Sequence, residues 1–297
     1  MIPKINKAEL LNVMKLVEKQ YGVGSVYTLD SNKANLSIDR WSTGIEQLDY
    51  ILGGGMPYGR IIELFGAESS GKTSLGYHLS AQHKVALNIP IEGTFDATRA
   101  KSFGNKKGQF IIRRADYGEA ALEFVREFAK AGCPIAVLDS VPACVPKKLL
   151  GEEDYEKEQQ PGMVAKMFSD KLPRLNHVVE SSGMTLILIN QLRDTMNAML
   201  FGPKDHTPGG RAIKFYSSVR IGIARKEWIK ITNRYDPKNS AKMLDIGLIM
   251  KVKVHKSKVC QPLGECEIPL LFDYGFVSFD EIPKLKKEIQ SKLRNGV

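Results

Sequence analysis

The stretch Gly66-Ala-Glu-Ser-Ser-Gly-Lys-Thr73 indicates the fold of this 297-residue sequence. It has the spacing G-x-x-x-x-G-K-[ST], follows the apolar run Arg60–Phe65 and precedes Lys72–His83, a run with helical periodicity. Glycines in such a turn let backbone N–H groups surround a phosphate at a helix N-terminus. Lys72 can then reach the β- and γ-phosphates, and the Thr73 hydroxyl can bind Mg²⁺. The residues assigned to this phosphate site are Gly66, Glu68, Ser69, Ser70, Gly71, Lys72, Thr73 and Ser74.

A nucleoside triphosphatase also needs acidic groups beside the phosphates. The apolar run that begins at Pro134 ends in Asp139, and an acid at this place supports the metal ion in related sites. Many parallel strands end in aspartate, so Asp139 is informative only together with the phosphate loop. Glu92 follows another apolar run and is placed to activate water for hydrolysis. The alternative interpretation of Glu92 is a solvated loop carboxylate.

The remaining sequence up to about residue 190 alternates short apolar runs with amphipathic ones. This pattern predicts an α/β fold, with a mostly parallel central sheet covered by helices on both faces. After Gly210 the alternation of polar and apolar residues, as in Met250–His255, predicts half-exposed strands. Pro173 is expected to kink the last of the helices. Strands are expected at Arg60–Phe65, Val85–Ile91, Phe110–Arg113, Ile135–Leu138 and Thr185–Asn190, and helices at Lys72–His83, Gly118–Ala131 and Met163–Ser182.

The two ends of the chain are expected to lie outside this core. Ala8–Tyr21 has the apolar spacing of an amphipathic helix, and Gly24–Leu29 resembles a short isolated strand. Such a unit is too small to fold alone, so it must pack on its own core or on a neighbouring subunit. We therefore divide the chain into an N-terminal extension, residues 1–33, which would serve subunit polymerisation if it packs on a neighbour, a core, residues 34–272, and a short C-terminal segment, residues 273–297.

Composition restricts the kind of partner. The sequence carries 43 Lys and Arg against 33 Asp and Glu, a net charge of +10. Of this excess, +9 lies between Arg211 and the end, which fits either a polyanion partner or a solvated basic face. No apolar run approaches the roughly 20 residues of a membrane span, and no secretory signal is visible. Four cysteines without zinc-type spacing predict reduced thiols. These features predict a soluble intracellular protein.

Taken in order, these and further motifs resemble the RecA family of homologous-recombination ATPases, including its phage relatives. The resemblance implies a RecA-type P-loop core that uses ATP and Mg²⁺. It also implies a helical filament on single-stranded DNA that pairs with homologous double-stranded DNA, in the cytoplasm of a bacterial or phage-infected cell. The chain stops soon after Phe279, which predicts a shortened, phage-type member. The match includes Glu18–Ser25, Gly59–Glu63, Glu68–Thr73, Asp139–Val141, Ile189–Arg193, Phe201–Gly202, Gly209–Gly210, Lys214–Arg220 and, as its last residue, Phe272.

The resemblance also assigns roles to residues outside the phosphate loop. Gln191 would sense the γ-phosphate and relay its presence to DNA. Asp96 and Phe272 would lie beside the adenine, and Arg99 stands where the family often has a stacking aromatic residue. Two lysines would reach the ATP of the neighbouring subunit. The catalytic residues implied in this way are Lys72, Glu92, Gln191, Lys256 and Lys258.

Two DNA-binding loops are implied at about residues 151–162 and 191–211. Glycine N–H groups can approach a phosphodiester closely, and Arg or Lys can neutralise it. Methionines in the second loop can act as adaptable apolar wedges between bases, although simple packing is the alternative. The residues assigned to DNA are Lys166, Ser169, Arg174, Arg193, Met196, Gly209, Gly210 and Arg211.

The sequence departs from the family at several places, which keeps two alternatives open. Pro90 stands where the family usually has an acid two residues before Glu92, and residues 151–160 are strongly acidic for a loop that contacts DNA. The first alternative is a RecA-fold motor of the helicase type, which shares the phosphate loop but is disfavoured by the Gly209-Gly210 loop and the N-terminal helix and strand. The second is a non-hydrolysing single-strand DNA-binding or mediator protein, which Pro90 keeps open.

Overall fold

The computed structural model describes residues 6–22, 25–26, 38–93, 95–105, 110–150, 162–194, 205–232, 243–262 and 264–294. The chain divides into two compact units, Met1–Asp39 and Arg40–Val297. The second unit contains the sheet and the sites discussed below.

The described part of the first unit contains helix α1 (Lys7–Tyr21), in agreement with the predicted helix. The Asn6 side chain caps it by accepting a hydrogen bond from the Ala8 backbone N–H at 3.1 Å. No residue of α1 is buried, and Leu10 and Leu16 are 50% and 65% exposed. Within the first unit the apolar side chains of α1 are therefore not covered. Most of the strand expected at Gly24–Leu29 lies outside the described residues.

The parallel half of the central sheet places the phosphate loop. Among the described residues the sheet has the order β13-β12-β11-β10-β3-β7-β6-β4-β5, and all neighbours from β10 to β5 are parallel. The expected strands are confirmed to within two residues at each end. The five strands are β3 (Ile61–Gly66), β4 (Ala86–Pro90), β5 (Phe110–Ile112), β6 (Ile135–Asp139) and β7 (Thr185–Gln191).

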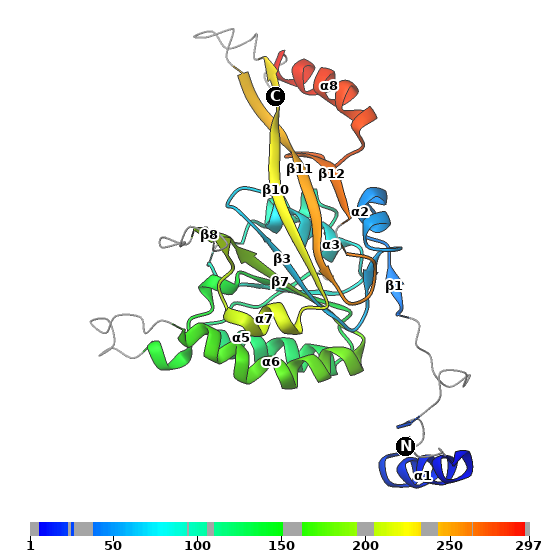
Figure 1. The fold of residues 1–297 in the computed structure, drawn as a ribbon. Helices are drawn as coiled ribbons and strands as arrows, with labels where there is room; N and C mark the ends of the chain where they lie inside the picture. Colours follow the sequence, from blue (N-terminus) through cyan, green and yellow to red (C-terminus); the bar gives the residue numbers. More distant parts are fainter. Residues whose placement is uncertain are drawn as a thin grey trace, which may run out of the picture. The chain divides into compact units, whose positions relative to one another are not determined.

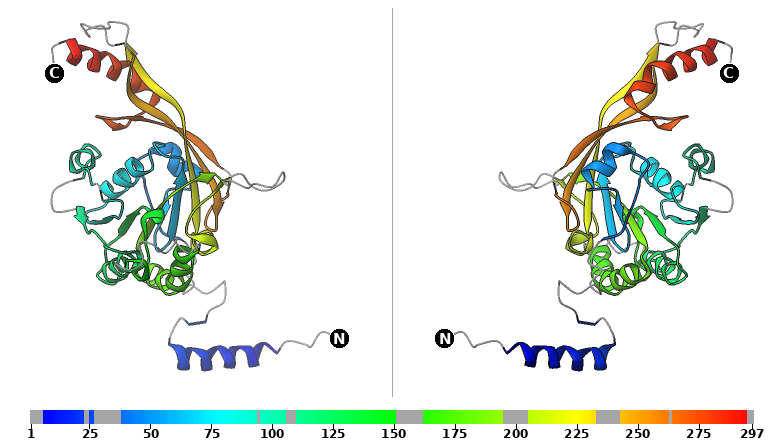
Figure 2. Two further views of the ribbon diagram at one scale, coloured as in Figure 1. Left: turned by 90° about the vertical axis from the view of Figure 1, so that its left-hand side faces the viewer. Right: turned by 90° about the vertical axis from the view of Figure 1, so that its right-hand side faces the viewer.

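The other half of the sheet is antiparallel. The long strands β10 (Val219–Thr232) and β11 (Met243–Ser257) pair with each other, and β12 (Glu265–Leu271) and β13 (Gly275–Phe276) extend the sheet. Around Val252 every second side chain of β11 is buried, as the alternation predicts. Figure 1 and Figure 2 show the β10–β11 pair extending beyond the helical layers, with helix α8 near its far end.

Helices cover both faces of the parallel half, as the sequence predicts. Ile62 and Leu64 of β3 pack in one apolar cluster with α2, α3 and α4, while Ile61 packs in a second with α5, α6 and α7. Helix α6 continues past Pro173 to Ser182. The helix bounds are α2 (Glu46–Ile51), α3 (Lys72–Ala81), α4 (Ala97–Ser102), α5 (Gly118–Lys130), α6 (Met163–Ser182), α7 (Gly210–Tyr216) and α8 (Ile282–Arg294).

Short elements complete the second unit. Two small antiparallel pairs are formed by β1 with β2 and by β8 with β9. The C-terminal segment contains the basic helix α8, whose Glu288 accepts a hydrogen bond from Tyr274 at 3.0 Å. No helix in the described ranges is long and apolar enough to cross a membrane. The short strands are β1 (Arg40–Trp41), β2 (Met56–Pro57), β8 (Arg193–Asp194) and β9 (Asp205–His206), and 3₁₀ turns lie at Val141–Ala143, Lys147–Leu149 and Phe279–Glu281.

Candidate functional site

The phosphate loop joins β3 to α3 and lies directly against the antiparallel hairpin. A Cβ atom on Gly66 would lie 1.9 Å from the carbonyl oxygen of Ile223, so only glycine fits at that position. Gly71 has a φ of 95°, and a Cβ there would lie 2.8 Å from the sulfur of Met250. Close packing against the backbone therefore requires glycine at position 66, and the positive φ favours glycine at position 71.

Lys72 is 7% exposed and points back into the loop. Its Nζ donates to the carbonyl oxygens of Gly66 at 3.0 Å and Ala67 at 2.6 Å. Burial lowers the pKa of Lys72, while Asp139 and other nearby acids oppose this effect. An anionic phosphate in the loop would be a stronger acceptor for this ammonium group than neutral carbonyl oxygens.

Thr73 and Asp139 lie side by side, as a P-loop metal site requires. The Thr73 hydroxyl donates to Oδ2 of Asp139 at 2.7 Å. Burial raises the pKa of Asp139, the hydrogen bond from Thr73 lowers it, and the charge of Glu92 raises it further. A cation placed here would be stabilised by the carboxylate, whose charge is otherwise poorly solvated.

The predicted general base contacts the predicted γ-phosphate sensor. Oε1 of Glu92 accepts hydrogen bonds from Ser140 Oγ and, at 3.2 Å, from Gln191 Nε2. These three residues follow or end strands β4, β6 and β7, whose carboxyl ends meet at one edge of the sheet. Ser140 was not predicted as a site residue, although it directly follows Asp139 in the sequence.

Two cavities adjoin the phosphate loop. The larger has a volume of about 480 Å³, and its polar end is formed by the loop and its apolar end by aromatic and aliphatic side chains. The smaller, about 130 Å³, is lined by Thr73, Asp139, Glu92 and Asn88, among others. Nδ2 of Asn88 is buried without a hydrogen-bond partner, so a polar ligand in this cavity would satisfy it. The larger cavity is lined by Ser69, Ser70, Gly71, Lys72, Thr73, Ser74, Tyr77, Phe95, Asp96, Arg99, Trp228, Leu248 and Phe272.

The residues predicted beside the adenine lie together at the apolar end of the larger cavity. Arg99 donates to the Ser74 hydroxyl at 2.9 Å, and its guanidinium carbon lies 5.8 Å from the ring centre of Phe272. Asp96 accepts a hydrogen bond from the Arg99 backbone N–H and so caps α4. Trp228, on β10, was not predicted here, because nothing in the sequence indicates that the hairpin folds over this cavity.

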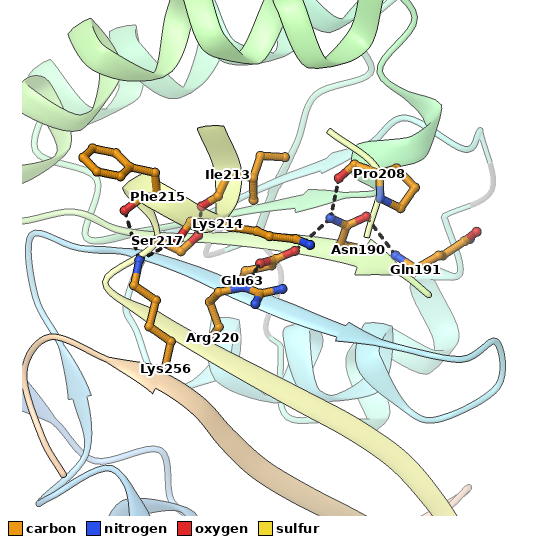
Figure 3. Close-up of polar contacts among 10 residues, drawn as sticks. All are labelled: Glu63, Asn190, Gln191, Pro208, Ile213, Lys214, Phe215, Ser217, Arg220 and Lys256. Atoms are coloured by element: carbon orange, nitrogen blue, oxygen red, sulfur yellow. Dashed lines mark hydrogen bonds and ion pairs between the residues drawn. The ribbon is translucent and has the colours of Figure 1, made fainter. Parts of the chain in front are cut away.

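Lys256 and Lys258 line neither of these cavities in their own chain. The Nζ atoms of both donate to the carbonyl oxygen of Phe215, at 3.0 and 3.1 Å, and Lys256 also donates to that of Lys214. Figure 3 shows Lys256 beside the end of α7. Burial lowers the pKa of Lys256, and the charges of Lys258 and Arg220 lower it further. In this structure the two lysines neutralise the carbonyl end of a helix.

Most of the described DNA-binding candidates lie where α6 and α7 begin, while Arg174 lies in the middle of α6. A Cβ on Gly210 would lie 2.6 Å from the Cβ of Ala165, so the first turns of the two helices are in contact. Lys166, Ser169 and Arg174 are exposed on α6, and Arg211 is exposed on α7.

The second DNA loop was predicted to extend to Arg211, but Gly210 and Arg211 belong to the first turn of α7. This correction arises because α7 packs on α6, a contact that local sequence does not reveal. Met196, the side chain of Arg193 and residues 151–161 lie outside the described part of the chain.

Sequence comparison with known proteins identifies relatives of this chain. The family described as the RecA N-terminal domain matches residues 8–277. The protein named Protein RecA of Thermus aquaticus is 37% identical over 276 residues, which cover 91% of this chain and 77% of that protein. Its namesake in Campylobacter fetus subsp. fetus is 36% identical, covering 93% and 79% of the two chains. That of Brevibacillus brevis is 34% identical, covering 98% and 80%.

Replacing Lys72 with alanine tests the phosphate site. We expect nucleotide hydrolysis to fall by at least about 100-fold, because the variant loses the cation that would face the phosphates of a bound nucleotide. The melting temperature should change little, since the ammonium group contacts the loop rather than the apolar core. Lys84→Ala, at an exposed lysine after α3, is the control and should keep full turnover. A Lys72→Ala variant with most of its activity would contradict the assignment.

Proposed function

Because the chain belongs to the RecA family, we propose that the cavities around Lys72 bind ATP with Mg²⁺ and that Glu92 activates the attacking water. The resemblance indicated by the motifs is confirmed, and the protein is a RecA-type recombinase and DNA-dependent ATPase. Relatives of this kind bind DNA and form filaments. The observation that carries the proposed site is the convergence of Lys72, Thr73, Asp139 and Glu92 at one sheet edge.

The larger cavity suits a nucleotide at both ends. Backbone N–H groups and Lys72 would hold the phosphates, and the base would lie near Arg99 and Phe272. In the described part of the chain no three His, Cys, Asp or Glu residues form a metal-binding cluster. Mg²⁺ would therefore take most of its ligands from phosphate and water, with the Thr73 hydroxyl as a direct ligand and Asp139 beside it. When bound, it would neutralise charge on the β- and γ-phosphates.

Hydrolysis needs a water molecule in line with the γ-phosphate. Glu92 would orient this water and accept its proton, while Lys72 neutralises the phosphoryl charge. The hydrogen bond between Glu92 and Gln191 supports a link to DNA, because Gln191 begins the second DNA loop. A γ-phosphate that attracts the Gln191 amide would break this bond and free Glu92 for water.

Glu92→Gln tests the proposed base. The amide keeps the size of the side chain but cannot take a proton, so we expect turnover to fall by about 100-fold or more. ATP-dependent binding to single-stranded DNA should persist, because the phosphate loop is unchanged. Filter binding and phosphate release measure the two properties. If the variant hydrolyses ATP at the parental rate, the base lies elsewhere.

We place single-stranded DNA along the starts of α6 and α7. The exposed side chains of Lys166 and Arg211 provide positive charge there, Arg174 adds positive charge further along α6, and the two helices touch through Gly210. Contacts of this kind go to the phosphodiester backbone, so they fix the position of the strand without reading its sequence. Homologous double-stranded DNA is the proposed partner for pairing.

Arg211→Ala should weaken DNA binding through charge alone. We expect the slope of log affinity against log salt concentration to fall by about one for this variant, without any new base preference. Fluorescence anisotropy with labelled oligonucleotides of several sequences measures this slope. Lys84→Ala, at the opposite edge of the sheet, should leave it unchanged. Parental binding that does not respond to salt would refute the proposed DNA surface.

Filament assembly would complete the ATP site with residues from the next subunit. The exposed apolar face of α1 supports docking of the N-terminal extension on a neighbour. We propose that Lys256 and Lys258 contact the neighbour's ATP. Two observations support this role: both ammonium groups donate to the same carbonyl oxygen, that of Phe215, and neither lysine lines the nucleotide cavity of its own chain. The carbonyl groups of α7 hold both ammonium groups on one side of the hairpin.

A mixing experiment tests whether the lysines act between subunits. The double variant Lys256→Ala/Lys258→Ala should lose turnover but still bind ATP through its own Lys72. Equal mixing with Lys72→Ala should restore activity at roughly a quarter of the interfaces, as random mixing in a head-to-tail filament gives. Each variant alone is the control. No recovery at any ratio, although labelled subunits are shown to co-assemble, would leave these lysines as structural charges of α7.

A further inference from the structure

A buried carboxylate lies in the middle of the sheet and takes no part in the ATP cavities. Glu63 belongs to β3, three residues before the phosphate loop, and its side chain is completely buried. It lies between β7 on one side and β10 on the other. A buried charge is costly unless it is paired and hydrogen-bonded, so its partners show what it holds in place.

The first partner is Asn190, also completely buried, at the end of β7. Its Nδ2 donates to Oε1 of Glu63 at 2.9 Å and to the carbonyl oxygen of Pro208 at 2.9 Å. Its Oδ1 accepts a hydrogen bond from the Gln191 backbone N–H at 3.0 Å. One amide group therefore ties both ends of the second DNA loop to the carboxylate of Glu63 (Figure 3).

The second partner is Arg220 at the start of β10. Its Nε lies 2.5 Å from Oε2 of Glu63, and its guanidinium carbon lies 4.6 Å from the ring centre of Phe65. Arg220 is directly opposite Lys256 in the pairing of β10 with β11. The pairing with Arg220 fixes the position of Lys256 on β11. From this position the Lys256 ammonium group donates hydrogen bonds to carbonyl oxygens at the end of α7.

We propose that Glu63 is a positioning residue that sets Gln191 and Lys256 relative to each other through Asn190 and Arg220. This inference rests on the proposed function, in which Gln191 contacts the subunit's own ATP and Lys256 that of the neighbour. Because Asn190 holds the ends of the second loop, a strand of DNA that moves this loop pulls on the Glu63 carboxylate. The same carboxylate holds β10 through Arg220. DNA binding to one subunit therefore shifts the position of Lys256, which contacts the ATP of the next subunit.

Stability alone does not account for this ion pair. A buried pair of charges contributes little compared with apolar side chains of similar volume, because both ions lose their hydration. An apolar replacement of both partners can therefore keep the core intact while it removes the connection. This difference separates a positioning role from simple packing.

The test uses the full-length protein with Glu63→Gln and with the paired variant Glu63→Met/Arg220→Met. For both we expect the DNA-stimulated ATPase rate to fall about tenfold or more, within the range of coupling between sites. Binding of a fluorescent ATP analogue without DNA should stay within about twofold of the parent, because neither residue lines the nucleotide cavity. The melting temperature of the paired variant should be close to that of the parent. Glu180→Gln, which removes the exposed ion pair with Arg60, is the control and should change none of these properties.

Each outcome decides the question. A paired variant that folds and keeps full DNA stimulation would overturn the inference, as would failure of both variants to fold, since Glu63 would then serve the core itself. A parental protein without DNA-stimulated hydrolysis would overturn the proposed function and this inference with it. A stimulated parent with equally stimulated variants would overturn the inference alone.

Discussion

The pairing of β3 with a parallel strand on each side is the constraint on which the rest of this structure depends. On one side lies β7, which leads to Gln191, and on the other lies β10, which begins the hairpin with Lys256. At its carboxyl end β3 becomes the phosphate loop, and the contact of Gly66 with the Ile223 carbonyl holds this loop against the hairpin. One strand thus lies beside the proposed nucleotide site, the proposed DNA loop and the lysines proposed to face the next subunit.

Charge in the C-terminal half has more than one use. Several basic residues of the hairpin pair with acids of β12, as Lys226 does with Glu267 and Lys251 with Glu265. Exposed pairs of this kind contribute little to stability, but they reduce the free positive charge on that face. The net charge therefore overstates the surface open to nucleic acid. Arg220 and Lys256, by contrast, are partly buried and hold defined positions.

The proposed arrangement of the ATP site would explain why such a protein works as an assembly. The subunit's own residues would provide the phosphate loop, the metal-side groups and the base, all at one sheet edge. Lys256 and Lys258, which would neutralise negative charge on the phosphates of the neighbour's ATP, do not lie at this edge. They are held by a carbonyl group at the end of α7. A nucleotide between two subunits would then be recognised from both sides, so hydrolysis and assembly depend on the same contacts.

Much of this organisation is determined by the sequence alone. The phosphate loop, five parallel strands and helices α1, α3, α5 and α6 follow from local spacing and periodicity, which act within a few residues. The short helices α2, α4 and α7 escaped prediction, because such helices are unstable alone and depend on packing. The contacts of Glu92 with Gln191 and of Glu63 with Asn190 and Arg220 join residues about 100 to 160 positions apart. Only the order of strands in the folded sheet brings such residues together. Local sequence determines where helices and strands form, but it does not determine which strands lie next to each other.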